Sequence, residues 1–166
     1  VLGASAATQA ERLAFAARAP ELGCDIVLVN LPYESDAQYL REIAEIAEAA
    51  RRDVMVQDWD ASGPGVPLPA VLAAFAAVPA FRYLKIETAN AGPKYTALKD
   101  ATGGKAHVSG GWAVMQLIEA LDRGVDAFMP TALHPVYVEI VRRHAAGERD
   151  GAVALFRRVL PVLAFA

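Results

Sequence analysis

One pattern repeats along the chain: a short apolar run, rich in β-branched residues, is followed by an alanine-rich segment with helical spacing. These runs share a preceding glycine or charged residue and span residues 25–30, 53–57, 81–87, 106–109 and 125–130, and residues 1–3 resemble the end of another strand. Near-continuous apolar runs are typical of strands buried on both faces, and their alternation with helices indicates βαβ units. The pattern therefore predicts an α/β protein with a parallel sheet.

The segments between these runs are predicted to be helices. Their expected ranges are residues 9–22, 37–51, 70–75, 93–101, 111–122, 135–146 and 151–163. Thr8 and Ser35 are residue types that cap helix N-termini, and Pro69 suits an early helical position. No linker or change of composition divides the sequence, so we expect a single domain over residues 1–166.

Two architectures fit this order of elements. An open doubly wound sheet needs about five strands and suits a chain of 166 residues. A (β/α)8 TIM barrel needs eight strands and roughly 250 residues. The number of strands favours the open sheet, whereas the strand-like opening at residues 1–3 favours a barrel whose first two βα units lie upstream.

Composition excludes several classes of function. The chain is 55% apolar, which is too high for a disordered protein, and its net charge of −3 is unsuited to binding nucleic acid through phosphate contacts. The single cysteine, Cys24, cannot build a disulfide framework, and no apolar stretch of membrane-spanning length is uninterrupted. We therefore expect a cytoplasmic protein with a small-molecule substrate, no nucleic-acid partner and no membrane association.

Lys85 is the residue most informative about chemistry. It lies between Leu84 and Ile86 in an apolar run, so alternation along the strand places it on the same face as Tyr83 and Glu87. Inside a barrel that face is shielded from water, which favours the neutral amine that attacks carbonyl groups. Such a lysine forms a Schiff base and needs no metal. The structural alternative, a lysine at a strand edge or paired with Glu87, is equally compatible with the sequence.

The sequence around Lys85 resembles the dihydrodipicolinate synthase and N-acetylneuraminate lyase family, which are class I Schiff-base lyases on a TIM barrel. Residues 84–87 (Leu-Lys-Ile-Glu) carry the resemblance, and they follow residues 57–60 (Gln-Asp-Trp-Asp) one unit earlier. It extends in order through residues 29–33, 109–111 and 124–131. The resemblance implies that Lys85 is the Schiff-base lysine and that barrel strands three to eight, the C-terminal two-thirds of the barrel, are present. It also implies a homo-oligomer, a dimer or tetramer, and no cofactor.

The chain departs from the family at the position of a tyrosine that moves protons to and from the substrate. Gln57 stands there, and an amide does not titrate. We therefore expect Tyr33, Glu34, Glu87 or a water held by Asp58 to replace it. The arginine that holds a second carboxylate in dihydrodipicolinate synthases has no counterpart in residues 61–65, and Ser62 is closer to members that bind sugar-derived 2-oxo acids.

Together, these features predict an aldolase or dehydratase acting on a 2-oxo acid, such as a 2-oxo-3-deoxy sugar acid or pyruvate plus an aldehyde. The expected catalytic residues are Lys85, Tyr33 and Glu87. The expected substrate-binding residues are polar or small groups at strand ends: Gln57, Asp58, Ser62, Ser109, Gly110 and Thr131. No metal site is expected.

Two alternatives remain at this stage. A divalent-metal lyase or isomerase on the same barrel would use the carboxylates of Asp58, Asp60 and Glu87, since oxygen ligands suit Mg²⁺. A non-catalytic small-molecule-binding protein would explain why Gln57 replaces the tyrosine.

Overall fold

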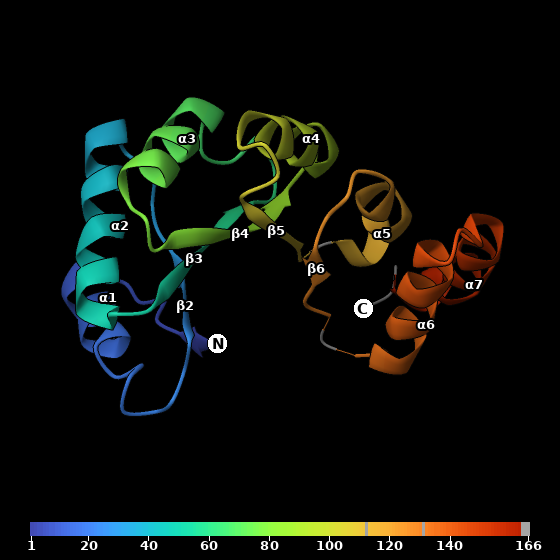
Figure 1. Cartoon of the computed structure of the whole chain (residues 1–166), viewed down its shortest axis with the longest axis horizontal. Coiled ribbons are helices and arrows are strands. Elements are labelled where there is room, and N and C mark those ends of the chain that lie inside the picture. Colours follow the sequence, from blue (N-terminus) through green and yellow to red (C-terminus); the bar gives the residue numbers. More distant parts are fainter. Residues whose placement is uncertain (112, 131, 164–166) are drawn as a thin grey trace.

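The computed structural model describes residues 1–111, 113–130 and 132–163 (Figure 1). The strands are β1 (Leu2–Gly3), β2 (Ile26–Asn30), β3 (Asp53–Asp60), β4 (Phe81–Thr88), β5 (His107–Gly110) and β6 (Ala127–Phe128). The helices are α1 (Gln9–Ala16), α2 (Asp36–Ala50), α3 (Leu68–Ala77), α4 (Ala91–Ala101), α5 (Ala113–Asp122), α6 (His134–Ala145) and α7 (Arg149–Leu163). Trp112, Thr131 and residues 164–166 lie outside the described residues.

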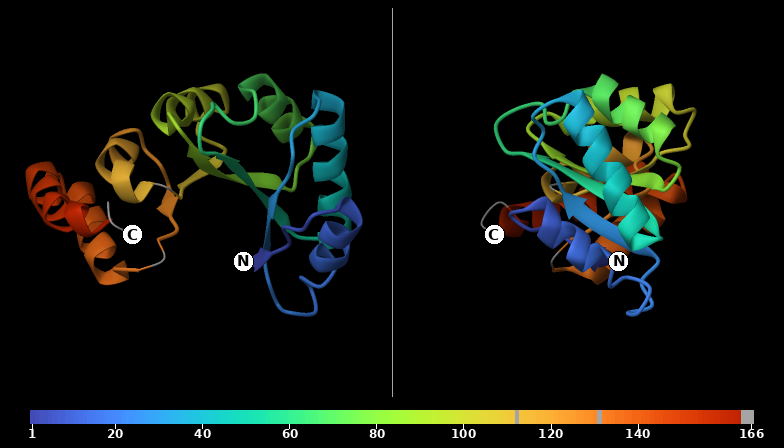
Figure 2. Two further views of the ribbon diagram at one scale, coloured as in Figure 1. Left: turned by 180° about the vertical axis from the view of Figure 1, so that it is seen from behind. Right: turned by 90° about the vertical axis from the view of Figure 1, so that its left-hand side faces the viewer.

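The sheet follows the order of the sequence. Each strand pairs in parallel with the next, from β1 to β6, and the sheet curls into a half-barrel with α1 to α4 on its convex side (Figures 1 and 2). A doubly wound sheet requires a reversal of strand order, which this sheet lacks across β1–β6, so that alternative is wrong. The arrangement is consistent with a partial TIM barrel.

Local sequence explains where the N-terminal helices begin and end. The Thr8 side chain accepts a hydrogen bond within a capping box at the start of α1, and the Ser35 side chain accepts the backbone N–H of Gln38 at the start of α2. The helix predicted over residues 9–22 ends at Ala16 instead, and turns follow it. Pro20 explains the difference, because it lacks an N–H donor and disfavours helical backbone in the preceding residue.

The main core lies between the convex face of the sheet and the helices. It includes Val29, Val56, Leu84 and Ile86 from the strands, each no more than 2% exposed. Because side chains alternate along a strand, the residues between them face the concave side. A second core cluster joins α5, α6 and α7 through Leu117, Tyr137, Ile140, Ala152 and Phe156. In the described part of the chain, no helix is long and apolar enough to span a membrane.

Candidate active site

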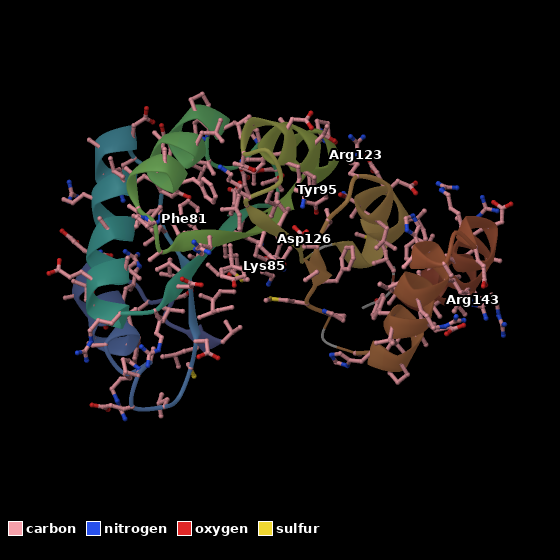
Figure 3. The ribbon with its side chains drawn as sticks, in the orientation of Figure 1. Phe81, Lys85, Tyr95, Arg123, Asp126 and Arg143 are labelled. Carbon is pink, nitrogen blue, oxygen red and sulfur yellow. The ribbon has the colours of Figure 1, made fainter. Side chains whose placement is uncertain are left out.

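Lys85 lies on the concave face of the sheet, in the middle of β4. Strand register pairs it with Gln57 on β3 and with Ser109 on β5, so these three residues form one row across adjacent strands. Figure 3 shows Lys85 on the side of the sheet away from α3 and α4. Its side chain is 15% exposed. The expectation that this lysine would be shielded on the face opposite the helices is confirmed.

Glu87 connects Lys85 to Gln57. The Glu87 Oε1 atom lies 3.4 Å from Lys85 Nζ, and the side chain of Glu87 is 9% exposed. The other carboxylate oxygen accepts a hydrogen bond from the Gln57 side-chain amide. A carboxylate in this position neutralises the ammonium group and is close enough to take a proton from it. The structure thus brings together three of the residues predicted from the sequence.

The start of the β5–α5 connection leaves room for Glu87. A side chain on Gly111 would overlap the Glu87 carboxylate, so only glycine fits at this position without moving it. Gly110 lies in the β5 ladder, where it pairs with Ile86 on one side and Phe128 on the other. Gly111 therefore has a packing role that is visible in the structure.

Ser109 adds a hydroxyl group beside the amine. It is fully buried, and its Oγ atom has no hydrogen-bond partner among the described residues. A buried hydroxyl without a partner costs free energy, which a bound polar group would recover. Ser109 is therefore suitably placed to hydrogen-bond a substrate held at Lys85.

A pocket of about 330 Å³ opens at the C-terminal ends of β2 and β3. Its lining includes Tyr33, Gln57, Trp59 and Asp60. The Tyr33 hydroxyl donates a hydrogen bond to Asp36 at 2.5 Å, and this bond raises the pKa of Tyr33 above its usual value. Gln57 belongs to both the pocket lining and the Lys85 row, whereas Lys85 itself is not one of the lining residues.

Asp58 occupies the opposite face of β3 from Gln57. Its side chain is 1% exposed and forms an ion pair with Lys94 of α4, with Nζ 2.5 Å from Oδ2. Its Oδ1 atom accepts the backbone N–H of Val66 at 2.9 Å. The structure therefore does not bring the Asp58 carboxylate to Lys85, and its contacts are those of a residue that anchors the β3–α3 loop.

Lys94 was missed by the sequence reasoning, although a signal for it exists. It lies in the first turn of α4, where the helix dipole disfavours a positive charge. Its Nζ atom donates to the carbonyl groups of Pro64 and Val66, at 2.9 and 2.5 Å, in addition to pairing with Asp58. An unfavourable lysine in a first turn indicates that a specific partner lies nearby.

The remaining predicted residues are not gathered at Lys85. Ser62 is exposed in the β3–α3 loop, where it lines a separate cavity of about 630 Å³ between that loop and α4. Asp60 accepts backbone N–H groups of the same loop. Thr131 falls outside the described residues. The carboxylates of Asp58 and Glu87, which the metal hypothesis requires together, lie on opposite faces of the sheet.

Within residues 1–111, 113–130 and 132–163, no group of three or more His, Cys, Asp or Glu side chains is close enough together to hold a metal ion. The chemistry that these residues offer is instead that of an amine beside a carboxylate.

The curled parallel sheet is consistent with a partial TIM barrel, and comparison with known proteins shows which solved structures share this fold. A putative dihydrodipicolinate synthetase from Pseudomonas aeruginosa superposes with a TM-score of 0.87 at 21% identity, over 98% of this chain and 58% of its own. Dihydrodipicolinate synthase from Rhodopseudomonas palustris gives 0.85 at 22%, over 98% and 57%.

N-acetylneuraminate lyase from Fusobacterium nucleatum gives a TM-score of 0.84 at 13% identity, over 93% of this chain and 54% of its own. The chain thus spans little more than half the length of these proteins. No family model and no curated protein sequence matches the chain. These likenesses show the fold, and both kinds of protein named by the resemblance in the sequence are found among the structures that share it.

Proposed function

We propose that the protein is a class I lyase, an aldolase or dehydratase, that forms a Schiff base with a 2-oxo acid through Lys85. The observation that carries the proposal is the Lys85 amine, 15% exposed on the concave face and 3.4 Å from the Glu87 carboxylate. The shared fold of dihydrodipicolinate synthase and N-acetylneuraminate lyase supports the same class.

The proposed reaction begins when Glu87 takes a proton from the Lys85 ammonium group. The neutral amine adds to the C2 carbonyl of the 2-oxo acid, and loss of water gives a protonated imine. In a cleavage, a base takes the proton of the substrate's C4 hydroxyl, the C3–C4 bond breaks with its electron pair moving towards the imine nitrogen, and an aldehyde and an enamine form. In a dehydration, loss of a C3 proton forms the enamine, which then expels the C4 hydroxyl as water when that group is protonated. Protonation of the cleavage enamine, and hydrolysis of the imine in either case, release the product and restore the amine.

The neighbouring side chains would position the substrate. Ser109 offers a polar substrate group its hydroxyl, which has no hydrogen-bond partner in the part of the chain that the structure describes, and Gln57 can hydrogen-bond but cannot transfer a proton. Proton transfer along the path taken by the family's tyrosine therefore falls to Glu87, with Tyr33 at the mouth as a further candidate. We assign the chain to barrel strands three to eight, and propose a cytoplasmic homo-oligomer with a small 2-oxo acid substrate.

Trapping with borohydride tests this proposal. Treating the protein with pyruvate and borohydride is expected to reduce the imine and leave a stable added mass on Lys85, located by peptide mapping. Lys85→Arg should abolish the added mass, and Lys105→Arg, a change at an exposed lysine, should leave it intact. Absence of an adduct, or an adduct on another lysine, would refute the proposal.

A non-catalytic binding protein is the second candidate, and Gln57 in place of the family's tyrosine favours it. In that case 2-oxo acids would raise the melting temperature without turnover. A ligand-dependent shift that persists in Lys85→Ala, together with no trapped adduct, would identify this case.

A further inference from the structure

We propose that His107, acting through the Ser109 hydroxyl, takes the proton that the substrate loses as the enamine forms and later returns it. This inference rests on the proposed function, because it takes a 2-oxo acid to be bound to Lys85 as an imine. It goes beyond the roles given to Glu87 and Tyr33, since it adds a proton-transfer group nearer the N-terminal ends of the strands.

His107 lies on the concave face, in the row of side chains that precedes Lys85. Strand register pairs Lys85 with Ser109 and Tyr83 with His107, so His107 and Ser109 are two residues apart on the same face of β5. Strands about 4.8 Å apart with a rise of about 3.3 Å per residue put the Cα atoms of Lys85 and His107 about 8 Å apart. The curl of the sheet directs both side chains towards the same region (Figures 1 and 2).

Two side chains of β5 on this face each carry a buried polar atom without a partner. His107 Nδ1 and Ser109 Oγ are both buried, and neither has a hydrogen-bond partner among the residues that the structure describes. Buried polar groups in native proteins are nearly all hydrogen-bonded, because an unpaired one costs free energy. Two such atoms, two residues apart on one strand, are therefore suited to bond to the same polar group or to each other.

The ring of Tyr83 holds the imidazole of His107. The two ring centroids are 5.0 Å apart, and the ring planes are inclined at 51°. Aromatic rings at this distance attract one another, so the contact restricts the orientation of the imidazole. Because the contact is between rings, it leaves His107 Nδ1 available for proton transfer.

The imidazole supplies chemistry that other neighbours of Lys85 lack. The Gln57 amide does not titrate, and a serine hydroxyl needs an adjacent base to take up a proton efficiently. In the proposed relay, the substrate's proton moves to Ser109 Oγ while the serine's own proton moves to His107 Nδ1, directly or through one water molecule. The electron pair left on the substrate moves towards the imine nitrogen. The reverse transfer returns the proton, so the cycle gains and loses no proton or electron.

Charged groups on both sides of β5 act on His107. The ammonium group of Lys85, paired with Glu87, faces it from β4 and disfavours the imidazolium form. Asp126, next to β6, favours that form. Burial raises the pKa of Asp126, but hydrogen bonds from a backbone N–H and from Lys99, together with the charge of His107, lower it overall. The opposing charges thus act on the type of side chain that ordinarily exchanges protons between about pH 5 and 8.

Hydrogen–deuterium exchange at the methyl group of pyruvate tests the relay. The exchange requires a substrate proton to leave and return, whereas borohydride trapping requires only the imine. His107→Gln, followed by NMR in D2O against a buffer blank, should slow exchange at least about 10-fold and leave the half-saturating pyruvate concentration for trapping unchanged. His144→Gln is the matched control, because His144 bonds to Asp122 at 2.9 Å between α5 and α6, and it should change neither.

Two further readouts separate a relay from a structural role. Exchange by the unaltered protein should rise with pH across the range in which imidazole titrates, and His107→Gln should flatten this profile. Ser109→Ala should also slow exchange. Because residues of a relay act as a unit, the double variant should lose no more exchange than the more severe single variant.

The outcomes distinguish this inference from the proposed function. Failure of pyruvate to form any adduct at Lys85 refutes the Schiff-base function. Normal trapping with no exchange, with unchanged exchange in His107→Gln, or with losses that multiply in the double variant overturns the inference alone. Equal losses of trapping and exchange in His107→Gln also overturn it, because they indicate a structural role. If His107→Gln does not fold, a flat pH profile of exchange by the unaltered protein overturns the inference, and a rise that Ser109→Ala flattens supports it.

Discussion

Replacing Lys94 by methionine tests the strongest structural interaction near the site. Lys94 Nζ lies 2.5 Å from Asp58 Oδ2 and also donates to the backbone carbonyl groups of Pro64 and Val66. Methionine keeps much of the length of the side chain but removes the charge and all three contacts. The change leaves the Asp58 carboxylate buried, with the backbone N–H of Val66 as its remaining hydrogen-bond partner among the described residues.

The expected loss of stability follows from the burial of both partners. Asp58 is 1% exposed and Lys94 is 10% exposed, so solvent screens the pair very little. Removing one partner of a buried ion pair costs about 3–5 kcal/mol, because it leaves a charge uncompensated. For a domain of this size, each kcal/mol lowers the melting temperature by roughly 2–4 °C, so the total shift should be about 6–20 °C.

Urea denaturation measures this loss as a change in midpoint at constant slope. Lys99→Met is a matched control, since Lys99 pairs with Asp126 at 2.9 Å but the two side chains are 21% and 32% exposed. That variant should lose only about 1 kcal/mol or less. Adding Asp58→Asn to Lys94→Met should recover part of the loss. A loss below about 1 kcal/mol in Lys94→Met, or no recovery in the double variant, would show that the ion pair is not what stabilises this region.

Two further predictions concern other parts of the chain. Gly111→Ala should displace the Glu87 carboxylate and slow pyruvate trapping at least about 10-fold, because it removes part of an acid–base assistance of about 10²- to 10⁴-fold. Gly3→Ala, with open space around it, should not slow trapping, and equal rates in the two variants would contradict the packing argument. Hydrogen bonds, first from Arg149, lower the pKa of Asp122 to about 2 from 3.8, so its contribution to stability is present above pH 4 and lost as pH falls towards 2. Asp122→Asn should therefore flatten the dependence of melting temperature on pH between 4 and 2, and an unchanged dependence would argue against this assignment.

The face on which Lys85 lies was predictable from the sequence. Side chains alternate strictly along a strand, and the aliphatic neighbours Leu84 and Ile86 identify the helix-covered face. The same rule also gives the proximity of Glu87, two residues further along the strand. A single sequence is thus enough to predict which face of a strand a side chain lies on and which residues of that strand are its neighbours.

The placement of Asp58 was not predicted, because the end of β3 was placed too early. The apolar run over residues 53–57 predicts that Asp58 lies at or after the end of the strand, whereas β3 continues to Asp60. Once Asp58 is within the strand, alternation directs it to the face opposite Gln57, towards Lys94. Asp58 is polar, so it does not extend the apolar run that predicts the strand. The partner that allows its burial, Lys94, lies on α4, 36 positions further along the chain.

The contact between Gln57 and Glu87 depends on how two strands are staggered. The β3–β4 register shifts between Val54 and Met55, so the pairing at the start of the strands does not continue to their ends. A single sequence contains no signal for this irregularity. The composition of the site was therefore accessible from the sequence, whereas its hydrogen bonds required the three-dimensional arrangement.

The uneven lengths of the strands have a consequence for how the fold opens. β3 and β4 each have eight residues and lie in the middle of the sheet, whereas β1 and β6 have two residues each and lie at its margins. Amide hydrogen exchange should therefore be slowest in the strand that bears the amine and fastest at the margins, since opening free energy rises with the number of buried contacts. The Lys85–Glu87 pair is thus anchored in the segment expected to remain folded through most local fluctuations.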